Sequence, residues 1–268
     1  MATSLHQQLK EHYVTDPASH EIELDDYRID AVAADGTLIE IQCASLSAIR
    51  DKVRKLTKCH KVTVVKPLAW KKKLLKKQRR NGRVVSSRYS PAHQTLPDIF
   101  LELVHFTSAF PHPNLQLDIL LTEQEEIRVP AKRKTWRRKY ITLDRRLVSV
   151  EQTISVCTAK DLWRHLNADL PVEFTTAELA EAADIPRRLA QKAAWCFRKM
   201  SFLEQTGKQG NSVVYRCVPS RDVRESGGFF RSPSFTSDSS NTSLCENGSA
   251  VHPEKDDRRV PPSSRRAA

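Results

Sequence analysis

A hairpin signal near the N-terminus constrains the fold of this chain more than any other feature. Residues 27–42 read YRIDAVAADGTLIEIQ, two runs of alternating apolar residues around a turn at residues 34–36. This pattern is typical of a β-hairpin. With a three-residue loop whose glycine is left-handed, Asp30 faces Glu40, and Gln42 shares their side of the sheet. A two-residue loop would instead place the two carboxylates on opposite faces.

Two carboxylates that face each other across adjacent strands repel unless a positive charge lies between them. A hard divalent cation such as Mg²⁺ suits this position, because it prefers oxygen ligands. The alternative is a solvated strand face on which Asp30 and Glu40 are exposed, as charged residues commonly are. The hairpin alone leaves both interpretations open.

Elements on both sides of the hairpin predict a small mixed sheet. Residues 5–14 have the apolar spacing of a helix, and residues 20–24 read as a strand. Residues 45–58 predict a second helix capped by its first serine. Residues 61–65 form a β-branched run, closed by Pro67, that predicts a buried strand. The connection between the third and fourth strands is long enough for a parallel crossover.

This order of elements, with Asp30 ten residues before Glu40 and Gln42 two residues after it, resembles the PD-(D/E)XK nuclease superfamily. Within it, residues 4–68 are most similar to the compact core of archaeal Holliday-junction resolvases. The resemblance implies that Asp30, Glu40 and the Ile41 carbonyl hold Mg²⁺ or Mn²⁺, and that the metal activates a water against a phosphodiester.

Gln42 departs from the pattern of the superfamily, which usually has lysine at this position. Glutamine can orient a water by hydrogen bonds but carries no charge at neutral pH. Lys52 or Lys55, on the helix that follows, would supply the missing cation if it points toward the carboxylates. The resolvase-like members also have a carboxylate on the first helix, and Glu11 fits that position; the alternative is an exposed helix glutamate.

The charge of the chain indicates a polyanionic partner. It has 44 Lys and Arg against 32 Asp and Glu, a formal charge of +12. Nine basic residues and no acidic one lie within residues 71–88, and residues 69–80 predict a basic helix; six more surround Trp136 in residues 132–139. Binding to DNA phosphates explains such runs, whereas the alternatives are a solvated face or a membrane-surface helix. The predicted DNA contacts in these runs are Lys71, Lys72, Lys73, Lys76, Lys77, Arg79, Arg80, Arg137 and Arg138.

Residues 155–218 have the element order of a second DNA-binding unit. Helices are predicted over residues 159–167, 177–183 and 186–200, and strands over residues 202–205 and 213–217. This order resembles a winged helix-turn-helix, in which a recognition helix enters the major groove and the wing touches the backbone. The resemblance implies DNA contacts by Arg187, Arg188, Gln191, Lys192 and Lys208. The alternative is a protein-interaction module, with Trp195 in the core or against a partner.

The remaining segments are less informative. Residues 96–106 suit either a buried helix or a strand, whereas residues 115–121, 126–129 and 139–143 predict strands. The tail, residues 219–268, is rich in Ser, Pro and Arg, and this composition predicts disorder.

Together these patterns predict an α/β (α+β) protein with a mixed-sheet nuclease-like core at residues 1–68 and a basic-helix and α+β extension at residues 69–150. A winged helix at residues 155–218 and the tail follow. The expected function is metal-dependent DNA cleavage. The alternatives are a non-enzymatic DNA-binding regulator or scaffold with a degenerate nuclease core, and a protein–protein adaptor.

Several common protein classes do not fit the sequence. Six cysteines without a CxxC pair, and no signal peptide or membrane span, predict a cytoplasmic protein, associated with the nucleoid in a bacterium. No Gly-rich phosphate loop is present, which argues against an ATPase. The sequence leaves a homodimer open.

Overall fold

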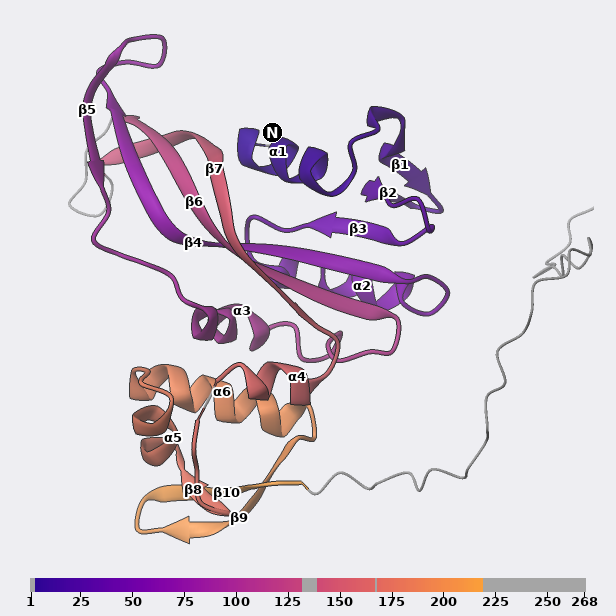
Figure 1. Ribbon diagram of the computed structural model, residues 1–268, viewed down its shortest axis with the longest axis vertical. Coiled ribbons are helices and arrows are strands. Elements are labelled where there is room, and N and C mark those ends of the chain that lie inside the picture. Colours follow the sequence, from indigo (N-terminus) through magenta and orange to yellow (C-terminus); the bar gives the residue numbers. More distant parts are fainter. Residues whose placement is uncertain (1–2, 132–138, 167, 219–268) are drawn as a thin grey trace, which may run out of the picture. The chain divides into compact units, whose positions relative to one another are not determined.

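The computed structural model describes residues 3–131, 139–166 and 168–218, all of which belong to one compact unit. Within this part of the chain the fold is mixed α/β, as expected: a large mixed sheet, a smaller antiparallel sheet and helices (Figure 1). The tail that is predicted to be disordered, and Arg137 and Arg138 of the second basic run, lie outside the described residues.

The N-terminal elements follow the predicted order. They are α1 (Ser4–Tyr13), β1 (His20–Leu24), β2 (Tyr27–Val32), β3 (Leu38–Ile41) and α2 (Arg50–Leu56). Ser45 caps a short 3₁₀ helix, η2 (Leu46–Ala48), ahead of α2. β3 pairs in parallel with the next strand, β4 (Val62–Lys77), so the predicted crossover through a helix is confirmed.

The hairpin has the three-residue loop that the carboxylate pair requires. Ala31 pairs with Ile39, the Ala33 N–H donates to the Thr37 carbonyl over 2.9 Å, and Gly36 has a φ of +83°. A residue with a Cβ is strained at such a φ, which is why glycine occupies this position. Extending this register by one residue beyond the Ala31–Ile39 pair places Asp30 opposite Glu40.

The fourth strand does not close at Pro67, and the predicted basic helix over residues 69–80 is wrong. β4 runs without a break from Val62 to Lys77. β6 (Leu115–Pro130) pairs in parallel along nearly its whole length, and β5 (Val84–Tyr89) pairs antiparallel with its second half. These two neighbours supply the backbone hydrogen bonds that a helix would have made locally.

Cross-strand charge pairing also favours the strand over the helix. Lys73 lies directly opposite Glu125 of β6, and the Lys73 Nζ is 3.1 Å from the Glu125 Oε1. Opposite charges facing each other across adjacent strands stabilise the sheet. The carboxylates that pair with these lysines lie on β6, much later in the sequence. The local pattern of lysines around Leu74 therefore does not indicate whether a helix or a strand forms.

The extension of the core is therefore a set of long strands. β6 is one strand where two short ones, residues 115–121 and 126–129, are predicted, and β7 (Tyr140–Val156) extends far beyond residues 139–143. The predicted boundary at residue 68 falls inside β4. We call the outer halves of β4, β6 and β7 (residues 71–77, 123–130 and 140–147), together with β5 and the loop that precedes it (residues 78–89), the β arm (Figure 1).

The two faces of the large sheet pack against different helices. α1 covers one face through Leu5 and Leu9, which contact Ile39, Ile41 and Val65. α2 and the helical segment η3 (Leu96–Ile99) with α3 (Phe100–Leu103) pack on the other face. Residues 96–106, whose sequence suits either helix or strand, thus contain helix and no strand.

The C-terminal elements share this second core. They are α4 (Ala159–Arg164), β8 (Glu173–Thr175), α5 (Thr176–Ala182), α6 (Arg187–Lys199), β9 (Leu203–Gln209) and β10 (Ser212–Cys217). Thr175 forms the predicted capping box with Glu178, and Pro186 stands at the N-cap of α6. The Phe197 ring of α6 lies 5.3 Å from the Phe100 ring of α3, which joins these elements to the large sheet.

Candidate functional site

Asp30 and Glu40 line one cleft of about 430 Å³, together with Ile41 and Gln42. The backbone pairing of β2 and β3 reaches Ala31, and one residue further the Asp30 Oδ2 accepts the Ile41 N–H over 2.8 Å. The Asp30 side chain thus replaces a backbone acceptor at the point where the two strands separate.

His6 of α1 holds the Asp30 carboxylate. Its Nε2 lies 3.2 Å from the Asp30 Oδ2, and both side chains are 18% exposed. Burial would raise the pKa of Asp30, but the His6 contact and the Ile41 N–H outweigh burial and lower the pKa below its ordinary value. Asp30 therefore stays ionised. The second ring nitrogen of His6, Nδ1, is buried and has no hydrogen-bond partner among the described residues.

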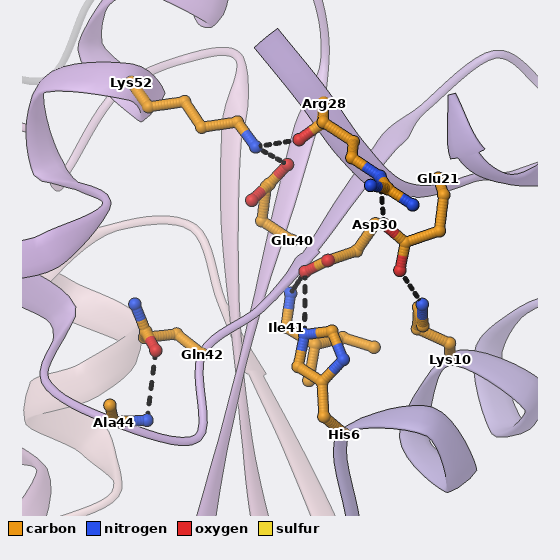
Figure 2. A network of polar contacts seen from close by, with 10 residues as sticks. All are labelled: His6, Lys10, Glu21, Arg28, Asp30, Glu40, Ile41, Gln42, Ala44 and Lys52. Carbon is orange, nitrogen blue, oxygen red and sulfur yellow. Dashed lines mark hydrogen bonds and ion pairs between the residues drawn. The ribbon is translucent and has the colours of Figure 1, made fainter. Parts of the chain in front are cut away.

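Lys52 of α2 holds the Glu40 carboxylate. Glu40 is only 3% exposed, and the Lys52 Nζ lies 2.5 Å from its Oε1 as an ion pair rather than an aligned hydrogen bond. The same ammonium donates to the Arg28 carbonyl. Figure 2 shows Glu40 pointing toward Lys52 and Asp30 toward His6.

The charge of Glu40 is poorly compensated. Burial raises its pKa to about 7, the negative charge of Asp30 raises it as well, and Lys52 offsets only part of this. Near neutral pH this carboxyl is consequently poised between its protonated and ionised forms. A further positive charge in the cleft would stabilise the ionised form.

Of the remaining predicted residues, some reach the cleft and others do not. Gln42 lines it, and its Oε1 accepts the Ala44 N–H over 3.0 Å (Figure 2). Glu11 is exposed, accepts a hydrogen bond from Gln7 and does not line the cleft, as its alternative interpretation has it. Lys55 lies over the Tyr27 ring instead of near the carboxylates.

Sequence reasoning missed the two basic residues that line the cleft, His6 and Arg145. His6 directly follows Leu5, one of the buried leucines of α1. Its position next to the apolar side of the helix was a signal in the sequence that it faces the sheet. Arg145 comes from β7, far along the chain, and only the pairing of β7 with β6 brings it here. No local pattern indicates that.

The basic residues of the first run lie on the β arm. Lys71, Lys76, Arg79 and Arg80 are exposed. The Lys72, Lys73 and Lys77 side chains are half-buried, and the first two face carboxylates on β6. Exposed cations on a protruding sheet are available to an extended polyanion.

The predicted recognition helix, α6, presents a polar and aromatic face. Arg187, Arg188 and Gln191 are exposed and Lys192 is half-buried. Trp195 is 37% exposed with the Lys199 Nζ 5.7 Å from its ring, so it belongs to the surface rather than the core. Leu179 of α5 and Leu189, Ala193 and Phe197 of α6 are buried in the core. Lys208 is exposed on β9, close to the turn of the β9–β10 hairpin.

The donors in the cleft suit a hard cation. Asp30 and Glu40 supply carboxylate oxygens, and the backbone at Ile41 adjoins both. Within the described ranges, no group of three or more His, Cys, Asp or Glu is placed to hold a metal. A magnesium site here would therefore depend on these two carboxylates with backbone or water oxygens.

The fold and the cleft define a mixed-sheet α/β protein with a pair of carboxylates, Asp30 half-buried and Glu40 buried, in one cleft. Residues 3–157, more than half of the chain, match the family described as "Domain of unknown function (DUF8091)", and the chain belongs to this family. It is similar to an "Uncharacterized protein" of Treponema pallidum (strain Nichols), 27% identical over 229 residues, which covers 83% of this chain and 88% of the relative.

The alignment with the Treponema protein is longer than the stretch that the family model matches, so the similarity extends into the C-terminal elements. No solved structure matches the chain. In the parts of the chain that the structure describes, no helix has the length and apolarity needed to cross a membrane.

Proposed function

We propose that this protein is a divalent-metal-dependent DNA nuclease that hydrolyses phosphodiester bonds in the cleft of Asp30 and Glu40. One observation carries the proposal: two carboxylates from adjacent strands line a single cleft, and the more buried of them, Glu40, has a raised pKa that an additional cation would lower. Titratable groups with such perturbed pKa values in a cleft are candidates for a functional site.

Each residue of the cleft has a distinct role in this proposal. Asp30 and Glu40 would hold Mg²⁺ or Mn²⁺, which when bound would polarise a water and neutralise a phosphate oxygen. His6 orients Asp30, and Lys52 orients Glu40. Because the Gln42 Oε1 already accepts the Ala44 N–H, the amide nitrogen is the group that Gln42 can offer to a water or a phosphate oxygen.

DNA would be held by the β arm and by α6. The exposed lysines and arginines of the arm would contact phosphates without regard to sequence, whereas α6 would present Arg188 and Gln191 to base edges. A substrate of this kind places the protein in the cytoplasm, with the nucleoid in a bacterium. A homodimer would bring two such clefts to one DNA.

A second function is favoured by the contacts that the carboxylates already make. The Asp30 carboxylate already pairs with His6, and the Glu40 carboxylate already pairs with Lys52. Gln42 lies at the position where the nuclease superfamily usually has a charged lysine. A protein that has lost catalysis but kept its DNA-binding surfaces would show this arrangement. It would act as a DNA-binding regulator or scaffold.

Cleavage assays separate the two functions. The purified protein is incubated with branched, single-stranded and duplex DNA in Mg²⁺, in Mn²⁺ and in chelator. The nuclease proposal expects products from at least one substrate with metal and none with chelator. Binding to DNA without cleavage under every condition would contradict it and favour the regulator.

A further inference from the structure

A second cavity adjoins the carboxylate cleft. It has a volume of about 380 Å³ and shares Cys43, Ala44 and Arg145 in its wall with that cleft. Two lysines of β4, Lys66 and Lys72, complete its basic lining. Three cations thus surround one cavity immediately beside Asp30 and Glu40.

The first of these cations is fixed by the fold. Lys66 is 4% exposed, its Nζ donates to the Ala44 carbonyl, and it lies 3.6 Å from the Glu102 Oε1. Glu102 also accepts the Leu46 N–H through Oε2 and so is shared between two donors. Burial lowers the pKa of Lys66, which shows that its charge is incompletely compensated there.

The other two cations share a single carboxylate. The Lys72 Nζ lies 3.8 Å and the Arg145 Nε 3.5 Å from the Glu126 Oε2, while Arg128 takes the Glu126 Oε1 at 2.5 Å. Burial lowers the pKa of Lys72, and the charges of Arg145 and Arg128 lower it further. The cations therefore repel one another around one negative charge.

The local charge balance points to an anion. Lys66, Lys72, Arg128 and Arg145 carry four positive charges, and the two carboxylates that they contact, Glu102 and Glu126, carry two, so an excess of two remains. The other polar groups of the wall include Gln94 and Gln124, so the cavity suits an oxygen-rich ligand rather than an apolar one. Arginine and lysine together are suited to phosphate.

We propose that this cavity binds a phosphate group of the nucleic acid that occupies the carboxylate cleft. The inference rests on the proposed function, because it assigns the neighbouring phosphate of the same substrate. Arg145 lines both spaces and would contact the nucleic acid between them. Lys66 and Lys72 would then hold the phosphate on the side away from Asp30 and Glu40.

The test uses binding in chelator, so that it does not depend on cleavage. Thermal unfolding of the full-length protein is followed with inorganic phosphate and with sodium chloride of equal ionic strength. We expect phosphate to raise the melting temperature of the wild type, because a ligand that binds only the folded state stabilises it. The gain should disappear in Lys72→Gln and Arg145→Gln.

Each variant has a control of the same residue type outside the cavity and the β arm. Lys58→Gln and Arg164→Gln remove exposed charges, and both should keep the phosphate-dependent gain. Unfolding without phosphate shows whether each variant is folded, and Lys72→Met gives a second, apolar replacement if Lys72→Gln is not. An equal gain in all variants, or no gain in the wild type above that in chloride, would overturn the proposal.

Oligonucleotides identify the source of the phosphate. Fluorescence anisotropy in chelator compares duplexes that carry a 5′-phosphate with duplexes that carry a 5′-hydroxyl. If the duplex with a 5′-phosphate binds about tenfold more tightly than the duplex with a 5′-hydroxyl, and Lys72→Gln removes this difference, the cavity binds a terminal phosphate. Equal affinity for both, lowered about tenfold by Lys72→Gln but not by Lys58→Gln, assigns a phosphate within the strand. If these results hold but no DNA is cleaved in metal, the cavity stands and the nuclease proposal fails.

Discussion

The ammonium of Lys52, on α2, lies 2.5 Å from the carboxylate of Glu40, on β3. Glu40 is nearly inaccessible to water, and Asp30 of the adjacent strand adds a second negative charge that raises its pKa. The ion pair thus fixes the position of one carboxylate, while the His6 contact fixes the other. The metal site that we propose needs both carboxylates to be held in place by the fold.

Removal of Lys52 should destabilise the protein through Glu40. Lys52→Met leaves a buried carboxylate without its partner, and we expect a loss of about 2–4 kcal/mol in the free energy of unfolding near pH 8. Most of this loss should be absent when Glu40→Gln is already present, because no buried charge is then left unpaired. Denaturant unfolding of the two single variants and the double variant measures the coupling. Additive effects would show that the two side chains act independently.

The raised pKa of Glu40 predicts how stability depends on pH. The unfolded carboxyl releases its proton near its ordinary pKa, whereas the folded one holds it to about pH 7, so ionising Glu40 weakens the fold as pH rises between these values. Relative to wild type, Glu40→Gln should therefore become more stabilising from pH 5 to pH 8 in chelator, by up to about 3 kcal/mol. Glu11→Gln, which changes an exposed carboxyl, is the control. A pH-independent difference would contradict the assigned pKa shift.

The local features of this fold could be predicted from the sequence. The loop at residues 34–36 sets its own register through a glycine with positive φ, and the Thr175–Glu178 capping box forms within four residues. The sequence could place Asp30 opposite Glu40 because a tight hairpin determines which residues face each other. These features depend on contacts between near neighbours in the chain.

The features that were missed depend on distant contacts. Residues 69–77 form a strand because β6, which comes much later in the chain, pairs with them. Arg145 enters the cleft through the register of β7 on β6, and Lys72 lines the second cavity because β4 continues past Pro67. Sequence periodicity carries no information about such pairings.

The β arm should contribute affinity for DNA without sequence preference. Neutralising Lys71, Lys76, Arg79 and Arg80 to glutamine should weaken binding to all duplexes alike. The log–log salt dependence should flatten by up to about 0.9 for each phosphate that is no longer neutralised. Anisotropy titrations over a range of salt concentrations measure both effects, with Lys58→Gln and Lys61→Gln as controls that remove exposed charges outside the arm. An unchanged salt dependence would show that these charges are only solvated and do not contact DNA phosphates.

The exposed face of α6 should carry any preference for a particular DNA site. Deleting the C-terminal elements is a poor test, because Phe197 packs on Phe100 and its loss would expose the core. Arg188→Ala with Gln191→Ala keeps the fold, and should reduce discrimination between sites by about 1–3 kcal/mol for each bidentate hydrogen-bonded pair that the substitutions remove. Competition binding with a selected and a scrambled duplex measures this. Unaltered discrimination would indicate that α6 binds a protein partner.

The central claim is tested most directly by the cleavage rate of Asp30→Asn beside wild type and Glu11→Gln, on the most readily cleaved DNA, in Mg²⁺ or Mn²⁺. We expect Asp30→Asn to abolish metal-dependent cleavage while DNA affinity in chelator is unchanged. Glu11→Gln, which changes a carboxyl outside the cleft on α1, should cleave as wild type does. Equal cleavage by all three proteins would show that the carboxylate cleft is not the site of hydrolysis.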